Sequence, residues 1–180
     1  MPFYHPLLEE FTQPIIFYTA TILNWNHLLQ DDLNKYIIIG GFTHLVDAQR
    51  LTIYAFVIMP NHIHALFSVR AENTLYEVQR DFNKYTAQQL KANMWVNDPY
   101  QLEKYRSTQK DREYQIWKRR PRSTPVYNEK TFLQKLNYIH NNPCRDKWKL
   151  AKNPEDYKFS SASFYSTGHT EWDFLTHYRE

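Results

Sequence analysis

Two histidines and a later tyrosine are the residues of this sequence whose types and spacing point to chemistry. His62 and His64 lie two positions apart in the segment YAFVIMPNHIHALFSV, residues 54–69. A strand repeats every two residues, so both imidazoles should share one face while the alternating apolar side chains occupy the other. Neutral imidazole is a common metal ligand, and the pair therefore predicts a divalent metal site. The same spacing also describes an ordinary pair of surface histidines.

Tyr138 is predicted on the outward side of a helix over residues 129–142, EKTFLQKLNYIHNN. At about 100° per residue, it lies about 160° from Leu136, at the centre of an apolar stripe. The stripe consists of Phe132, Leu133, Leu136 and Ile139. Asn142, four residues later, falls on the tyrosine's side and offers an amide oxygen as a third metal ligand. Pro143 disfavours helical geometry at Asn142, and a plain surface tyrosine is the alternative to a nucleophile.

Two segments resemble a known family. PNHIHAL, residues 60–66, resembles the HUH signature of the single-tyrosine transposases. LNYIHNNPCRDKW, residues 136–148, is similar to the tyrosine-bearing helix of the REP-associated tyrosine transposases, and EDYKFSSA, residues 155–162, resembles their C-terminal region. The resemblance runs from about residue 14 to residue 165. It implies that His62 and His64 are metal ligands, that Asn142 completes the metal site and that Tyr138 is the nucleophile.

The resemblance implies an HUH tyrosine transposase, a metal-dependent DNA endonuclease and nucleotidyltransferase acting on single-stranded or hairpin DNA. Tyr138 would attack a phosphate, release a 3′-hydroxyl and keep a 5′-phosphotyrosine bond, with Mg²⁺ or Mn²⁺ as the cofactor. The ester retains the energy of the phosphodiester, so rejoining needs no nucleotide, and the sequence has no GxxxxGK[ST] loop. Relatives occur as monomers and as dimers that share active sites, so a homodimer stays open.

Basic residues that could hold DNA are clustered. The stretch WKRRPRS, residues 117–123, places Lys118 beside three arginines, although formal net charge is only +3. Exposed Lys and Arg bind phosphates, but such a run also describes a solvated loop. The candidate phosphate contacts are Arg119, Arg120 and Arg122, with Lys84 and Arg80 on a preceding helix.

The elements that must position these residues suggest an α+β fold. We expect a strand over 14–23, a helix over 31–48, a hairpin over 51–69 and a helix over 74–92 with Leu75, Val78, Phe82 and Tyr85 on its core stripe. A fourth strand near 115–118, an extended piece at 126–127 and the tyrosine helix follow. This order predicts a ferredoxin-like split βαβ sandwich, a four-stranded antiparallel sheet with helices on one face and an additional tyrosine-bearing helix. The other face should present the histidines.

Composition sets the remaining bounds. A length of 180 residues predicts a single domain over 1–180, with a core of about 14–143 and a C-terminal extension, 144–180, packing on it. The single cysteine, Cys144, excludes an internal disulfide and fits a reducing, cytoplasmic setting. No apolar run approaches about 18 residues, so we expect no membrane partner.

Two other functions stay open on sequence alone. A non-catalytic nucleic-acid hairpin-binding module of ferredoxin-like fold would use the aromatics, 17% of the chain, and the arginines. A small metal-dependent hydrolase with another substrate is the third reading, and the absence of a carboxylate cluster near the histidines in sequence argues against it.

Overall fold

The computed structural model describes residues 10–70 and 72–180, and it contains one antiparallel sheet of four strands in the order β2-β3-β1-β4. The strands are β1 (Glu10–Thr21), β2 (Leu51–Met59), β3 (His62–Val69) and β4 (Arg122–Asn128). Residues 1–9 of the expected domain lie outside the described part. With α1 (Asp32–Asp47) after β1 and α2 (Leu75–Asn97) after β3, the predicted ferredoxin-like α+β architecture is confirmed.

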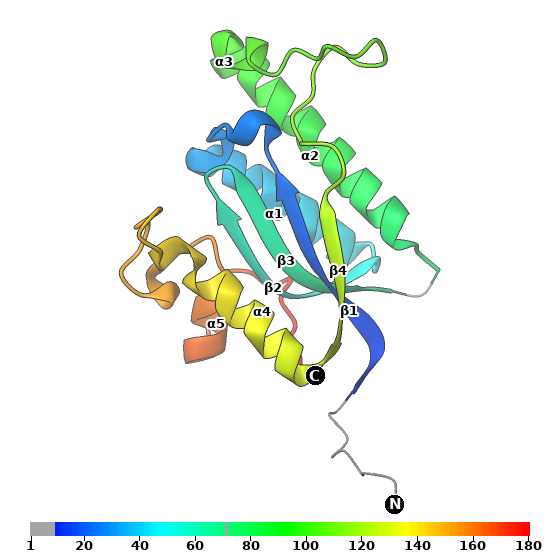
Figure 1. Ribbon diagram of the computed structural model, residues 1–180, viewed down its shortest axis with the longest axis vertical. Helices are drawn as coiled ribbons and strands as arrows, with labels where there is room; N and C mark the ends of the chain where they lie inside the picture. Colours follow the sequence, from blue (N-terminus) through cyan, green and yellow to red (C-terminus); the bar gives the residue numbers. More distant parts are fainter. Residues whose placement is uncertain (1–9, 71) are drawn as a thin grey trace, which may run out of the picture.

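The chain contains further helices between and after these elements. They are α3 (Pro99–Glu103), α4 (Glu129–Asn141) and α5 (Ala162–Thr167), with short 3₁₀ turns at Leu23–Trp25, Leu28–Gln30, Asn142–Cys144 and Pro154–Asp156. Figure 1 shows α1 and α2 behind the sheet and α4 in front of it. None of the described helices is long and apolar enough to cross a membrane.

The alternation along β3 separates these two layers. On one face, the ring of Phe67 packs on Tyr18, which in turn contacts Phe82 of α2. On the other face, the ring of His64 contacts Tyr138 of α4. The predicted division of β3 into a core face and a histidine face is therefore correct, and α4 covers the histidine face.

The fourth strand was predicted in the wrong place. Residues 115–118 form no strand, and Trp117 makes only an isolated antiparallel bridge to Ile22. The strand is β4, which pairs with β1 through residues 122–128. Pro125 lies within β4, and a proline argues against a strand when only the sequence is read. It is tolerated here because β4 is an edge strand, whose outer side needs no backbone N–H donor.

Two predicted helix faces also need correction. On α2, Val78 and Phe82 are buried as expected, but Tyr85 is exposed and the neighbouring Thr86 takes the next buried position, followed by Leu90. On α4, Leu133 is partly exposed, whereas Phe132, Leu136 and Ile139 are buried. A core that covers only part of a helix leaves the residues at the margin of an apolar stripe in solvent.

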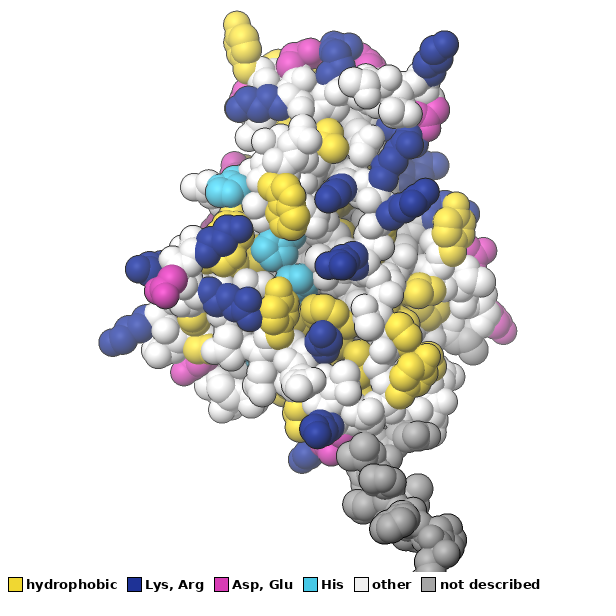
Figure 2. All heavy atoms as spheres, in the orientation of Figure 1, with side chains coloured by type: hydrophobic (Ala, Val, Ile, Leu, Met, Phe, Trp, Pro, Cys, Tyr) yellow, Lys and Arg dark blue, Asp and Glu magenta, His cyan; other side chains and the backbone are white. Residues whose placement is uncertain are grey.

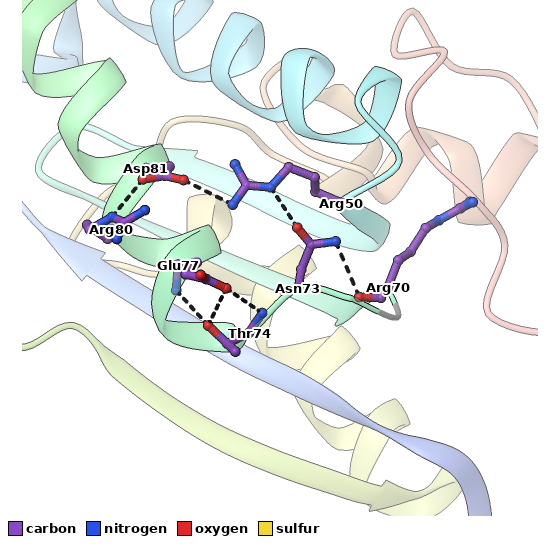
Figure 3. Close-up of polar contacts among 7 residues, drawn as sticks. All are labelled: Arg50, Arg70, Asn73, Thr74, Glu77, Arg80 and Asp81. Atoms are coloured by element: carbon purple, nitrogen blue, oxygen red, sulfur yellow. Dashed lines mark hydrogen bonds and ion pairs between the residues drawn. The ribbon is translucent and has the colours of Figure 1, made fainter.

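A polar network fixes the start of α2 against the hairpin (Figure 3). Thr74 is the N-cap, and it forms a reciprocal capping box with Glu77. Arg50, next to β2, donates to Asn73 at 2.9 Å and pairs with Asp81 of α2 at 3.0 Å. These bonds hold the first turns of α2, which carry two of the candidate DNA contacts.

Residues after α4 run along the outer side of β2. The Ile58 amide donates to the Phe159 carbonyl at 2.9 Å, and the Ser161 amide donates to the Phe56 carbonyl at 3.0 Å. His140 of α4 lies 2.9 Å from the same serine's hydroxyl, through its Nε2. The later chain therefore satisfies the backbone groups of an edge strand and joins it to the tyrosine helix.

Two adjacent glycines of α1 predict opposite stability effects. A Cβ on Gly41 would lie 2.9 Å from Thr86 Cγ2 and 3.0 Å from Phe82, whereas one on Gly40 would meet nothing closer than 4.0 Å. We expect Gly40→Ala to raise the free energy of unfolding by up to about 1 kcal/mol through helix propensity. Gly41→Ala should lower it, since α1 and α2 must separate. Urea unfolding of both variants tests this, and equal stabilisation by both would contradict it.

Candidate active site

His62 and His64 lie side by side on β3, and each is held by a polar neighbour. Both side chains are buried, and their ring centroids are 4.8 Å apart. His62 Nδ1 lies 2.7 Å from Asn61 Oδ1, and His64 Nδ1 lies 2.7 Å from the Thr19 hydroxyl. When Nδ1 of each ring donates its proton to this oxygen partner, Nε2 carries the free lone pair that a metal needs.

Burial keeps both imidazoles neutral. It lowers the pKa of His62 to about 4, with a further contribution from the positive charge of Lys147. It lowers the pKa of His64 to about 3, helped by His62 and then by Arg145 and Lys135. Imidazole must be unprotonated to bind a metal, so neither ring needs to lose a proton first near neutral pH.

Two buried atoms lack a hydrogen-bond partner within the described chain, His64 Nε2 and Asn142 Nδ2. An unpartnered buried polar atom costs about 1–3 kcal/mol unless a ligand or water satisfies it. The His64 atom is the one that a metal would use, so the residues present fit a metal here. Residues 10–70 and 72–180 contain no group of three or more His, Cys, Asp or Glu that could hold one, so further ligands would come from amide or phosphate oxygens.

Tyr138 reaches the histidine pair from α4. Its ring centroid is 5.2 Å from that of His64 and 6.0 Å from that of Phe17, with both contacts edge-on. Arg145 covers the ring at 4.4 Å, and the side chain is still 37% exposed. These ring contacts orient the Tyr138 side chain, whereas its hydroxyl has no hydrogen-bond partner among the described residues.

Asn142 occupies a more enclosed place than the other three predicted site residues. It is the C-cap of α4, it adopts helical angles despite Pro143, and it is buried. It does not line the cleft that contains His62, His64 and Tyr138. Rotating its amide by half a turn exchanges the oxygen with the unpartnered nitrogen, so its role as a ligand stays a proposal.

A basic cleft of about 660 Å³ opens over the two histidines and Tyr138. Figure 2 shows histidines near the middle of this face, with Lys and Arg side chains around them and acidic side chains toward the periphery. Besides the two histidines and Tyr138, this first cleft is lined by Phe17, Thr19, Thr21, Trp25, Lys118, Arg120, Pro121, Arg122, Thr124 and Lys135. Within the described chain, none of these four cations forms an ion pair with a carboxylate.

A second cleft of about 530 Å³ joins the first at Lys118, Arg120 and Pro121 and continues between α2 and residues 112–121. All five predicted DNA contacts line one cleft or the other: Arg120 and Arg122 line the first, and Arg80, Lys84, Arg119 and again Arg120 line the second. Two of them are partly neutralised, because Arg80 pairs with Asp81 at 2.8 Å and Arg119 lies 3.9 Å from Asp111.

Trp25 stands at the rim of the first cleft in an unusual backbone conformation. Asn24 and Trp25 both have positive φ, 56° and 57°, which is uncommon for any residue with a Cβ and rare for a bulky one. The indole is 53% exposed, and its ring centroid is 6.2 Å from that of His62. Asn61 donates to the Trp25 carbonyl at 3.1 Å through Nδ2, while its Oδ1 contacts His62.

Several residues of the site were not predicted from sequence. Lys135 lines the cleft from α4, and its position three residues before Tyr138 could have placed it on the same helix face. Asn61 precedes His62 directly. Thr19 and Trp25 carried no such signal, because their approach depends on the β1–β3 register and on the turn that follows β1.

Comparisons with known proteins identify a family model and two solved structures that are similar to this chain. A family model described as "Transposase IS200 like" matches residues 26–142. The structure of the REP-associated tyrosine transposase bound to a REP hairpin is similar in fold, with a TM-score of 0.63 and 18% identity over 98% of this chain and 92% of that chain. A crystal structure assigned to a transposase of Deinococcus radiodurans has a TM-score of 0.49 and 15% identity over 78% and 97% of the two chains. A search of curated proteins gave no match.

The family model spans more than half of the chain, and its segment contains both histidines, the tyrosine and every strand from β2 to β4. The chain therefore belongs to the IS200-like transposase family.

Proposed function

We propose that this protein cuts and rejoins single-stranded DNA through a covalent bond to Tyr138, acting on DNA that carries a hairpin. The observation that carries the proposal is the contact between the Tyr138 and His64 rings inside one basic cleft. A nucleophile, a neutral imidazole pair that can hold a metal and cations without an ion-pair partner are together suited to phosphoryl transfer. The family membership supports the same function, and the hairpin follows from what the REP-associated relative is bound to.

The proposed reaction forms one bond to phosphorus and breaks another. Tyr138 Oη forms a bond to phosphorus, and the bond from phosphorus to the 3′ oxygen breaks. The phenolic proton ends on the released 3′-hydroxyl, and the 5′ end stays on the protein as a phosphotyrosine. Attack by a 3′-hydroxyl reverses these changes and rejoins DNA without another energy source.

The surrounding side chains have distinct tasks in this proposal. Arg145 lies over the tyrosine ring, 4.4 Å from its centroid, and would hold the ring in place for attack. Lys135 and Arg122 line the same cleft and would hold the phosphate oxygens. When bound, Mg²⁺ or Mn²⁺ would neutralise charge on the scissile phosphate, with His62 and His64 as ligands and Asn142 as the proposed third ligand.

A covalent adduct is the direct test. The full chain is incubated with a labelled library of single-stranded hairpin oligonucleotides and Mn²⁺, and the products are separated on a denaturing gel. We expect a labelled band at the mass of protein plus DNA, which disappears when a chelator is added first. Salt-sensitive binding without an adduct under any divalent ion would instead favour the non-catalytic hairpin-binding module.

The unpaired cations predict how binding depends on salt. Each lost phosphate contact to a single strand should reduce the slope of log affinity against log salt concentration by about 0.7. We expect that change for Arg122→Ala, measured by fluorescence anisotropy with a labelled single strand. Lys152→Ala is the matched control, because that exposed lysine lies after α4 and lines neither cleft. Equal slopes for Arg122→Ala and the unmodified chain would remove this arginine from the proposed DNA path.

A further inference from the structure

We propose that Trp25 is a stacking platform for an unpaired base of the DNA strand, next to the phosphate that Tyr138 attacks. The inference rests on the proposed function and adds to it a binding site for a base. The indole lines the cleft with the tyrosine and both histidines. At 53% exposed, it offers ring surface that the protein itself leaves uncovered. Bases stack readily on such rings, and this contact tolerates any base because each has a π face.

The backbone at Trp25 supports a role in binding over a role in packing. Two successive residues with a Cβ hold positive φ there, and strained conformations of this kind gather at binding and catalytic sites. Burial of the Trp25 side chain does not offset this backbone strain, because the side chain is exposed where it lines the first cleft. Glycine or asparagine would adopt the same backbone at lower cost, so the tryptophan at this position needs another explanation.

The Trp25 backbone is tied to one of the proposed metal ligands through Asn61. One amide, that of Asn61, donates to the Trp25 carbonyl at 3.1 Å and contacts His62 Nδ1 at 2.7 Å. The indole ring centroid lies 6.2 Å from that of His62. A base on this indole therefore has its own phosphate within about one nucleotide of the imidazole pair.

A cation next to the indole completes a nucleotide-sized site. Lys118 Nζ lies 5.8 Å from the Trp25 ring centroid, and Lys118 lines both clefts. An aromatic ring for the base and an ammonium group for the phosphate are the two contacts by which proteins hold single strands. Trp95, by contrast, is 65% exposed on α2 and lines neither cleft, so it offers a matched aromatic control.

The test separates base contacts from phosphate contacts. Affinities are measured by anisotropy, with chelator present, for an oligothymidylate and for an abasic oligonucleotide of the same length. The variants are Trp25→Gly, Trp25→Phe and Trp95→Ala in the full chain. Glycine relieves the positive φ, so Trp25→Gly should fold at least as stably as the unmodified protein, which urea unfolding verifies.

We expect the unmodified protein to prefer the oligothymidylate, and Trp25→Gly to weaken that binding by about tenfold or more while leaving the abasic strand unaffected. Trp25→Phe should keep part of the preference, and Trp95→Ala all of it. Full preference in Trp25→Gly, or no preference in the unmodified protein, would overturn the stacking site and leave the proposed function standing. Failure of the unmodified protein to bind either strand would also overturn the stacking site, whereas the proposed function is decided separately by the adduct assay on hairpin DNA.

Discussion

Tyr138→Phe is expected to eliminate the covalent protein–DNA adduct while leaving the fold and DNA binding intact. Removing a nucleophile costs roughly 10⁴- to 10⁶-fold in the chemical step, because the remaining groups can only bind and orient the substrate. Phenylalanine keeps the ring contacts with Phe17, His64 and Arg145, and the lost hydroxyl has no partner among the described residues. The measurement is the yield of labelled adduct on a denaturing gel with Mn²⁺.

Tyr100→Phe is the matched control for that loss. Tyr100 lies on α3, is 90% exposed and lines neither cleft, so removing its hydroxyl should leave the adduct yield unchanged. An adduct of undiminished yield in Tyr138→Phe would show that another residue is the nucleophile. Peptide mapping of the adduct from the unmodified protein then identifies that residue directly.

His64→Ala is expected to reduce metal-dependent cleavage by about 10²- to 10⁴-fold, the range that several kcal/mol of metal-based charge stabilisation would give. The substitution removes the unpartnered Nε2 that faces the site and leaves Thr19 without its ring partner. His44→Ala, which changes an exposed histidine on α1, should have no such effect. Adduct yield is measured against Mn²⁺ concentration, and unchanged metal dependence in folded His64→Ala protein would contradict the assignment of this ligand.

The same two variants test whether one chain suffices. Within a single subunit the Tyr138 and His64 ring centroids are 5.2 Å apart, so we expect one chain to supply both groups. Mixing Tyr138→Phe with His64→Ala protein should therefore restore no adduct. Recovery to a substantial fraction of the original yield would mean that two chains exchange their tyrosine helices.

The sequence was most informative where a period and a chemical type coincide. His62 and His64 could be assigned to one strand face because alternation around them is regular, and Tyr138 could be placed opposite Phe132 and Leu136 by helical geometry. These inferences needed only neighbours along the chain. The ferredoxin-like order followed from the expected succession of a strand, a helix, a hairpin and a second helix along the chain.

The remaining features depend on contacts between distant segments. Only the extended piece at 126–127 of β4 was predicted, because Pro121 and Pro125 interrupt the pattern before it, and the full strand is defined by its pairing with β1 in the folded sheet. Thr19 meets His64 through strand register, and Trp25 reaches the cleft through a turn with positive φ. Neither register nor left-handed backbone can be read from residue types in these segments.

The pairing of residues 159–161 with the outer edge of β2 affects how the chain folds while it is still on the ribosome. The histidine hairpin emerges first, α4 follows, and the residues that pair with β2 near Phe56 and Ile58 come later still. Until they appear, β2 is an open edge that can pair with other chains, and α4 lacks its His140 link to Ser161. A nascent chain therefore carries its histidine pair before α4 is tied to the rest of the fold, and the face that holds His64 and Tyr138 is complete only after synthesis has passed Ser161.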